Sequence, residues 1–208
     1  MPVSVLHDEI ATLLRAILAS WAEKAASCLV ARDLAVRWDE THPQFGVDPD
    51  VAVFEPAPPT GSSLRSVRTW DTGHGPPLLA VEIVSETNPH KDYLVAPDKY
   101  AASGTQELWM FDPLLSGPRS QGGPFRLQVW SRDAGGDFVR THAGEAPARS
   151  SVLEAYIVVV DDGQKLRIAN DREGKDLWLT AEERERAAKE AALARVRELE
   201  AELAARSR

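Results

Sequence analysis

The sequence predicts an α/β domain with a central sheet, followed by a long C-terminal helix. Two apolar runs, LLAVEIV at 78–84 and ELWMF at 107–111, flank a short helical segment at about 97–104. This is the order of a strand–helix–strand crossover. The end of the chain is rich in Ala, Glu, Arg and Leu and almost free of helix breakers. We therefore expect an α/β domain over residues 1–177 and a coiled-coil-like helical tail over residues 178–208.

The first elements are a helix and two strands. Residues 4–26 are expected to form an amphipathic helix, because apolar residues recur at spacings of three and four. Residues 29–38 alternate imperfectly between apolar and polar, and VAVF at 51–54 is a short apolar run, so both are expected to be strands. Residues 55–77 are rich in proline and glycine and are expected to cross the surface as a long loop.

The centre of the sheet is expected at residues 78–84, because a nearly continuous apolar run is typical of a strand covered on both faces. The helix that follows is expected from Pro97 to Gly104, since proline suits a first helical position and glycine a left-handed C-terminal one. Four later segments predict strands added antiparallel to the sheet: residues 125–130, 138–141, 153–160 and 165–169.

The tail begins with a capping pattern, in which Thr180 is followed by Glu182 and Glu183. Its apolar residues have the spacing of a coiled coil: Ala192, Val196, Leu199 and Leu203. Because only about two to three heptads fit, a homodimer through this helix and a solvated single helix are alternatives of similar weight.

Composition sets limits on the class of protein. The 208 residues are 43% hydrophobic and 27% charged, as in a globular protein. No apolar run approaches the ~20 residues of a membrane span, and the first residues lack a signal-peptide pattern, so a cytoplasmic protein is expected. The single cysteine, Cys28, excludes an internal disulfide and a cysteine-based zinc site.

Charge and motifs exclude several activities. The net charge of −8 opposes loose binding to polyanions, so a nucleic-acid role needs a local site, in which metal ions could offset like charges. The sequence has no GxSxG elbow, no HExxH and no phosphate-binding GxxxxGK loop. Serine hydrolysis, zinc proteolysis and ATP hydrolysis are therefore disfavoured.

Glu82 is the most informative residue, because its carboxylate interrupts the apolar run at 78–84. Burying an unpaired carboxylate costs several kcal/mol, so such a residue usually pairs, binds metal or has a raised pKa. The alternative is an edge strand with Glu82 in water. Asp50, at the start of the 51–54 strand, supplies a second carboxylate, with Asp48 nearby. Two such oxygen ligands suit Mg2+ or Mn2+, although an Asp-Pro-Asp string can also be a simple turn.

Cationic residues follow the Glu82 strand. Lys91 and Lys99, with Asp92 between them, lie in the next segment. An ammonium group near a phosphodiester can offset the charge that gathers on phosphorus and hold the attacking water. Arg65 and Arg68 in the long loop are candidates for contacts with nucleic-acid phosphates. For each of these cations, a solvated surface charge is the simpler alternative.

Together these strings resemble the Uma2 family of restriction endonucleases, within the PD-(D/E)xK nuclease-like fold. The spacings agree without gaps from Glu82 to Pro113, and the loop string at 65–70 and the tail are similar to one subgroup. The matching residues are Pro49-Asp50, Val81-Glu82-Ile83-Val84-Ser85, Asp92, Tyr100, Gly104 and Glu107-Leu108-Trp109-Met110-Phe111-Asp112-Pro113.

The resemblance implies a restriction-endonuclease-like mixed central sheet flanked by helices. It also implies that Asp50 and Glu82 bind Mg2+ or Mn2+ while water attacks a DNA phosphodiester, with Glu9 on the first helix as an additional ligand. Many double-strand cutters pair two sites by two-fold symmetry, which makes a homodimer plausible.

The sequence departs from the nuclease pattern at the lysine. The general motif places lysine where this chain has Val84, and the resembling family places it where this chain has Ala96. Lys99, one helical turn beyond Ala96, is the expected substitute, and Lys91 is a second candidate. The alternative function is a catalytically weak or inactive member of the fold that binds nucleic acid, or assembles with partners through its C-terminal helix.

Overall fold

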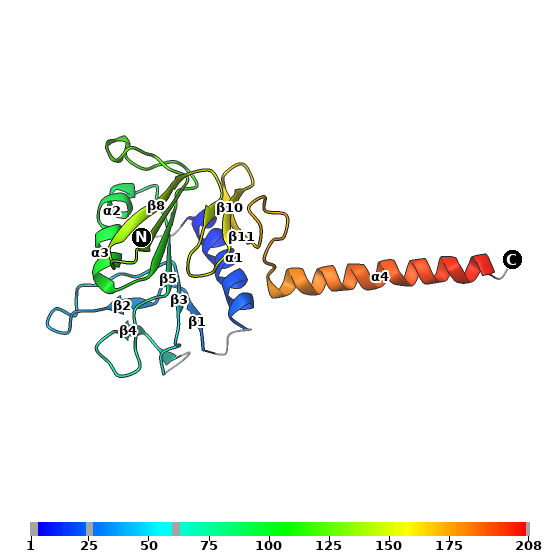
Figure 1. Ribbon diagram of the computed structural model, residues 1–208, viewed down its shortest axis with the longest axis horizontal. Helices are drawn as coiled ribbons and strands as arrows, with labels where there is room; N and C mark the ends of the chain where they lie inside the picture. The colour runs from blue at the N-terminus through cyan, green and yellow to red at the C-terminus, as the bar shows by residue number, and fades with distance from the viewer. Residues whose placement is uncertain (1–3, 24–26, 60–62, 207–208) are drawn as a thin grey trace. The chain divides into compact units, whose positions relative to one another are not determined.

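The computed structural model describes residues 4–23, 27–59 and 63–206. The chain divides into two compact units, Met1–Trp178 and Leu179–Arg208. The first unit holds every strand and three of the helices, and the second holds the long helix α4 (Figure 1).

The first unit is built on a six-stranded mixed sheet (Figure 1). The strand order is β1-β3-β5-β6-β7-β8, with β5 and β6 parallel and every other neighbouring pair antiparallel. The prediction of a central strand at 78–84 is confirmed, because β5 lies in the middle of this order. The strands are β1 (Leu29–Ala31), β3 (Val51–Phe54), β5 (Leu79–Ile83), β6 (Glu107–Phe111), β7 (Leu127–Arg132) and β8 (Phe138–Gly144).

The connection between the parallel strands β5 and β6 contains two short helices. These are α2 (Pro89–Leu94) and α3 (Ala96–Ser103), and α3 ends at Gly104 with a φ of 84°, in the left-handed region that glycine favours. The predicted crossover is therefore confirmed. The sequence reading missed α2, because the proline at the start of a six-residue helix resembles a loop signal.

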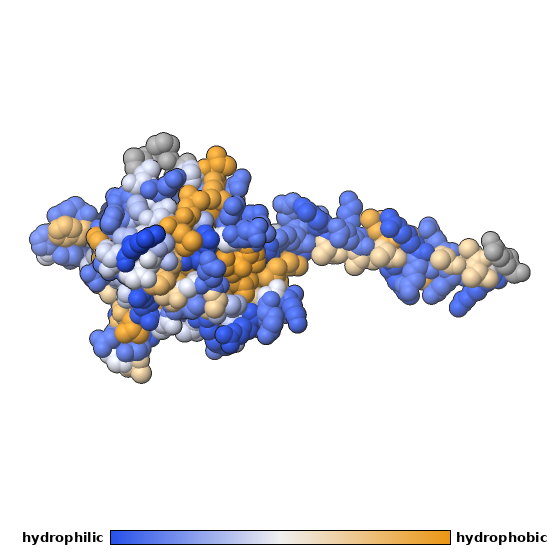
Figure 2. All heavy atoms as spheres, turned by 90° about the horizontal axis from the view of Figure 1, so that it is seen from above, coloured by the Kyte–Doolittle hydropathy of each residue, from blue (hydrophilic) through white to orange (hydrophobic). Residues whose placement is uncertain are grey.

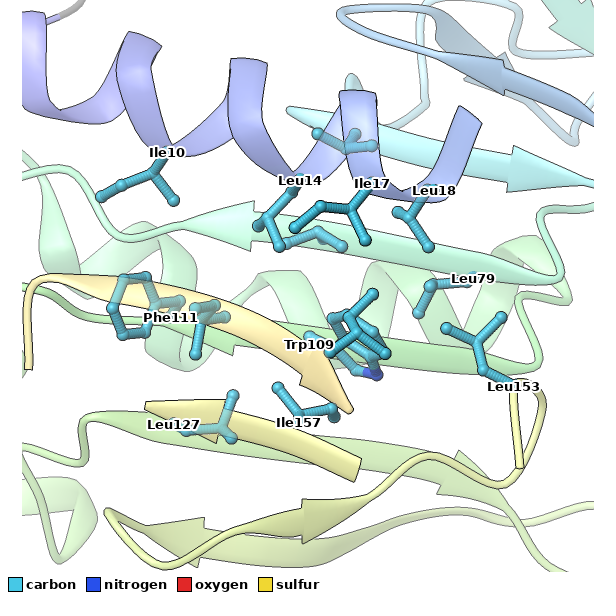
Figure 3. Close-up of a cluster of buried hydrophobic side chains, with 14 of the residues drawn as sticks. Ile10, Leu14, Ile17, Leu18, Leu79, Trp109, Phe111, Leu127, Leu153 and Ile157 are labelled. Atoms are coloured by element: carbon cyan, nitrogen blue, oxygen red, sulfur yellow. The ribbon is translucent and has the colours of Figure 1, made fainter. Parts of the chain in front are cut away.

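The two faces of the sheet are covered by different elements. Helix α1 (Val5–Ala22) lays the predicted apolar stripe on one face, where Ile10, Leu14, Ile17 and Leu18 are at most 1% exposed (Figure 3). Fully burying one such side chain stabilises the fold by about 1.5–3 kcal/mol. Helices α2 and α3 cover the other face, where the fully buried Tyr100 packs in a second core with Leu108 and Met110.

Two segments depart from the expected strands. Residues 29–38 form two strands, β1 and β2 (Ala35–Arg37), which belong to different sheets. Between them Asp33 has a φ of 50°, which ends the extended backbone. The loop at 55–77 contains β4 (Ser66–Arg68), which pairs in parallel with β2.

The last strands also separate from the main sheet. The segments expected at 125–130 and 138–141 do extend that sheet, as β7 and β8. In contrast, β9 (Ala148–Arg149), β10 (Tyr156–Val160) and β11 (Lys165–Ala169) form their own three-stranded sheet. Its apolar side chains, including Ile157, join α1 in covering the same face of the main sheet (Figure 3), which explains why they leave the sheet's edge.

The second unit is α4 (Ala181–Arg206), and its start confirms the capping pattern. The Thr180 N–H donates to Glu183 Oε2 at 2.8 Å, and the Glu183 N–H donates to Thr180 Oγ1 at 3.1 Å. Most side chains on the visible face of α4 are hydrophilic (Figure 2). In the part of the chain that the structure describes, no helix combines the length and the apolar character needed to cross a membrane.

Candidate active site

The site begins with the pairing of β3 and β5, which sets two carboxylates opposite each other. Val51 pairs with Val81 and Ala52 with Ala80, so one step further along this register Asp50 faces Glu82. Opposite residues of an antiparallel pair have Cβ atoms about 4.5–5.5 Å apart. The sheet therefore makes neighbours of the two carboxylates that the sequence singled out.

Glu82 is contacted from helix α3. Its Oε1 accepts a hydrogen bond from the Tyr100 hydroxyl of α3 at 2.6 Å. Burial raises the pKa of Glu82 well above its usual range, and the charge of Asp50 raises it further. The hydrogen bond from Tyr100 and the charge of Lys91 act in the opposite direction. Glu82 thus lies in a central strand rather than at an edge.

Asp50 is held by groups from β5 and α1. Its Oδ2 accepts a hydrogen bond from the Ile83 N–H at 2.7 Å and lies 3.2 Å from Nε2 of His7. The hydrogen bond to Asp50 raises the pKa of His7, although burial opposes this shift. Sequence reasoning missed His7. The signal that could have indicated it is its position as a titratable residue in the first turn of a helix whose apolar stripe packs on the sheet.

The resemblance named Glu9, two residues after His7, as a further ligand. Glu9 is exposed and its charge acts on Lys165. Because two residues span more than half a helical turn, His7 and Glu9 point in different directions. The structure brings His7, and not Glu9, to Asp50.

A small cavity of about 60 Å3 lies beside Glu82 and contains both candidate lysines. Lys91, Lys99 and Ala96 all line it. Helix α3 starts at Ala96 rather than Pro97, so Ala96 and Lys99 are one turn apart on the same face. Lys91 is exposed and lowers the pKa of Glu82.

Asp50 lines a larger cavity of about 240 Å3. Its walls come from the start of α1, the segment after β5 and the segment after β6, including His7, Ser85–Thr87 and Leu114. The carboxyl ends of β5 and β6 meet here. Such ends commonly hold binding sites in α/β sheets.

The remaining predicted acids lie near the site in supporting positions. Asp48 lines the cavity of Glu82, and its Oδ1 accepts from Arg37 at 3.1 Å. Asp92 is buried, and its Oδ2 accepts from the Ser85 N–H at 3.1 Å. Burial raises the pKa of Asp92.

The two arginines of the long loop lie elsewhere. Arg65 and Arg68 line an open hollow of about 350 Å3 together with Asp71 and His74. Neither arginine lines the cavities of Asp50 or Glu82.

The donor set is compatible with a hard divalent cation. Across residues 4–23, 27–59 and 63–206, no three His, Cys, Asp or Glu side chains form a group that could hold a metal ion. Mg2+ usually needs only one or two carboxylates and keeps several waters. Within the described chain, Oδ1 of Asp50 and Oε2 of Glu82 accept no protein hydrogen bond, so one oxygen of each carboxylate is available.

The fold is that of a nuclease-like α/β protein. A crystal structure described as a "putative nuclease belonging to DUF820 from Anabaena variabilis" has a similar fold, with a TM-score of 0.50 and 15% sequence identity. The similarity covers 74% of this chain and 76% of that chain.

The family model named Uma2, described as "Putative restriction endonuclease", matches residues 1–136. The chain therefore belongs to the Uma2 family, as the sequence motifs predicted. A search of curated proteins found no match.

Proposed function

We propose that this protein is a metal-dependent endonuclease that hydrolyses DNA phosphodiester bonds. The observation that carries the proposal is the cross-strand pair of Asp50 and Glu82, each with one oxygen that accepts no hydrogen bond from the described residues. Membership of the Uma2 family supports the reaction class, and the fold of the DUF820 structure supports the architecture.

In this proposal Asp50 and Glu82 hold Mg2+ or Mn2+. When bound, the cation would lower the pKa of a water and stabilise charge on the phosphate. Binding a cation also favours the ionised form of Glu82, because the positive charge offsets the burial and the Asp50 charge that raise its pKa.

Two lysines supply positive charge beside the cavity that Glu82 lines. An ammonium group there would offset the negative charge that gathers on phosphorus and would donate a hydrogen bond to the attacking water. Lys91 and Lys99 both line the cavity of Glu82. Ala96 stands where the family has its lysine, and Lys99 lies one turn further on the same face of α3. Lys91 is the lysine whose charge acts on Glu82.

The proposal extends to the partners of the protein. Its net charge of −8 makes local cations necessary for DNA binding, and Arg65 and Arg68 are the proposed contacts with the DNA backbone outside the cleavage site. A homodimer through α4 would pair two sites for double-strand cutting. The cytoplasmic location stays a prediction from the sequence.

A second candidate function is a nucleic-acid-binding or assembly module without efficient catalysis. The observation that favours it is that Ala96 lines the cavity at the position where the family has its lysine, so this position carries no ammonium group. The two functions differ in whether the purified protein cuts DNA.

The test is cleavage of supercoiled plasmid by the full chain in Mg2+, Mn2+ or EDTA. Asp50→Asn and Glu82→Gln, prepared identically, control for contaminating nucleases. We expect nicking that requires metal and is lost in both variants. Equal nicking by the variants, or no nicking by the wild type in either metal, would contradict the proposal, and metal-independent DNA binding would then favour the module.

A further inference from the structure

The two carboxylates of the site are each held by one oxygen only. Both groups that approach Asp50 do so at Oδ2: the Ile83 N–H at 2.7 Å and His7 Nε2 at 3.2 Å. Tyr100 donates to Oε1 of Glu82 at 2.6 Å. Oδ1 and Oε2 accept no hydrogen bond from the residues that the structure describes. This division between a held and an available oxygen is the same in both carboxylates.

His7 is anchored independently of Asp50. It lies in the first turn of α1, where its backbone N–H donates to the Ser4 Oγ at 3.2 Å. Its side chain is 17% exposed and that of Asp50 is 15% exposed. The other ring nitrogen, Nδ1, is buried and has no hydrogen-bond partner. Among the residues that the structure describes, the ring therefore makes its polar contact with Asp50 alone.

Tyr100 approaches from the opposite face of the sheet. It is fully buried in the core formed with α2 and α3, so the position of its hydroxyl is fixed by packing. The short bond to Glu82 crosses 18 residues of sequence, from α3 to β5. A helix therefore contacts each carboxylate: α1 contacts Asp50, which β5 also holds, and α3 contacts Glu82.

We propose that His7 and Tyr100 are a pair of positioning residues, which hold one oxygen of each carboxylate and so direct Asp50 Oδ1 and Glu82 Oε2 toward a divalent cation. Groups that hydrogen-bond metal ligands restrict their orientation, and removing such a group commonly weakens metal affinity by about 10- to 100-fold. This inference rests on the proposed function, because it assumes that Asp50 and Glu82 bind the metal.

The experiment measures Mn2+ affinity of the full chain without DNA, by the electron paramagnetic resonance signal of free Mn2+. The test variants are His7→Leu, His7→Gln and Tyr100→Phe. Asp50→Asn serves as the variant that lacks one of the two proposed metal-binding carboxylates. Gln can place an N–H near the position of the His7 Nε2, so it separates the hydrogen bond from the ring.

Two matched controls remove similar contacts away from the site. Tyr93→Phe removes a tyrosine hydroxyl that donates to a carboxylate of Asp112 at 3.0 Å. His42→Leu removes a histidine that lies 2.9 Å from a carboxylate oxygen of Asp39. Folding of every variant is checked by circular dichroism.

We expect Tyr100→Phe and His7→Leu to weaken Mn2+ affinity by about 10-fold or more. His7→Gln should recover most of the loss, and both controls should stay within about twofold of the wild type. If His7→Leu does not fold, Tyr100→Phe, which removes one oxygen atom, tests the proposal by itself.

Wild-type affinity in Tyr100→Phe and in a folded His7→Leu, with affinity lost in Asp50→Asn, would overturn the positioning role and leave the proposed function intact. Absence of a Mn2+ site in the wild type would overturn both. The two failures are therefore distinguishable.

Discussion

Two glutamates stand in apolar strands of the same parallel pair, and their surroundings differ sharply. Glu107 begins β6, and Glu82 lies near the end of β5. Glu107 is fully buried and accepts five hydrogen bonds from the residues that the structure describes. From the same residues Glu82 accepts one, and it has Asp50 as its cross-strand neighbour.

The partners of Glu107 come from several parts of the fold. Oε1 accepts from the Trp109 indole at 2.7 Å and the Ser150 hydroxyl at 2.6 Å. Oε2 accepts from the Ser131 hydroxyl at 3.2 Å, the Ser151 N–H at 2.7 Å and the Ser151 hydroxyl at 2.6 Å. Glu107 therefore ties β6 to β7 and to the turn before β10.

This comparison teaches how to separate a structural carboxylate from a ligand. A buried carboxylate whose two oxygens are both satisfied stabilises the fold. A carboxylate that keeps one oxygen unpaired beside a second carboxylate is unfavourable in its charged form, and either a proton or a bound cation relieves this cost. One end of the β5–β6 pair is thus structural and the other is the candidate active site.

The largest expected effect is on cleavage. Asp50→Asn and Glu82→Gln should each lower metal-dependent plasmid nicking by about 1,000-fold, because each removes a charged ligand from the charge-stabilising site. Glu107→Gln should leave the activity per folded molecule within about threefold of the wild type. Initial nicking rates, scaled to the folded fraction, measure this. A loss in Glu107→Gln equal to that in Glu82→Gln would remove the distinction between the two glutamates.

The next effect is on stability. Glu107→Gln should lower the free energy of unfolding by about 2–3 kcal/mol, because the new amide group faces buried donors and leaves some of them unsatisfied. Urea denaturation followed by tryptophan fluorescence measures the change. Glu40→Gln, an exposed glutamate, is the control and should change stability by less than about 0.5 kcal/mol. A neutral result for Glu107→Gln would show that its hydrogen bonds add no net stability.

A smaller effect is expected for the two lysines of the Glu82 cavity. Lys91→Met and Lys99→Met should each lower the nicking rate at saturating metal by about 10-fold, because an ammonium near the phosphate is removed. Lys175→Met, an exposed lysine outside the cavities, should leave the rate unchanged. Full activity of Lys99→Met with a loss in Lys91→Met would assign the role to Lys91 alone.

The smallest effect is a gain of stability in Glu82→Gln. The ordinary pKa of a glutamate is 4.5, and the pKa of Glu82 in the folded protein lies well above it. At a pH between the ordinary pKa and the folded pKa, the folded state therefore binds more protons than the unfolded chain. Stability contributed by this group therefore falls as the pH rises from about 4.5 through the folded pKa.

The neutral Gln should remove that fall and raise the Tm in EDTA at neutral pH by about 2–4 °C. Calorimetry across this pH range checks the sign. A lower Tm for Glu82→Gln at neutral pH, where glutamate should be least favourable, would contradict the role of burial.

Much of the fold was accessible from the sequence. The predicted strands at 51–54 and 107–111 match β3 and β6 to the residue, because short apolar runs between turn residues carry a strong local signal. The central position of β5 followed from its lack of alternation. The split at Asp33 and the separate sheet of β9–β11 were missed, since both depend on packing between distant segments.

The site was accessible only in part. Glu82 was singled out because a carboxylate inside an apolar strand is costly to bury, and Asp50 because it offers a second carboxylate at the start of another strand. His7 and Tyr100 act through contacts that cross 43 and 18 residues of sequence, and no local pattern reports such contacts. The number of donors around Glu107, which distinguishes it from Glu82, is likewise a tertiary property.

The most direct measurement compares thermal unfolding of the wild type, Glu82→Gln and Glu107→Gln in EDTA and in saturating Mn2+. A ligand that binds only the folded state raises the Tm. The account predicts that Mn2+ raises the Tm of the wild type and of Glu107→Gln by similar amounts, from a lower starting value in Glu107→Gln, and does not raise that of Glu82→Gln. A wild-type rise that persists in Glu82→Gln, or no rise in the wild type, would contradict the assignment of Glu82 to a metal site.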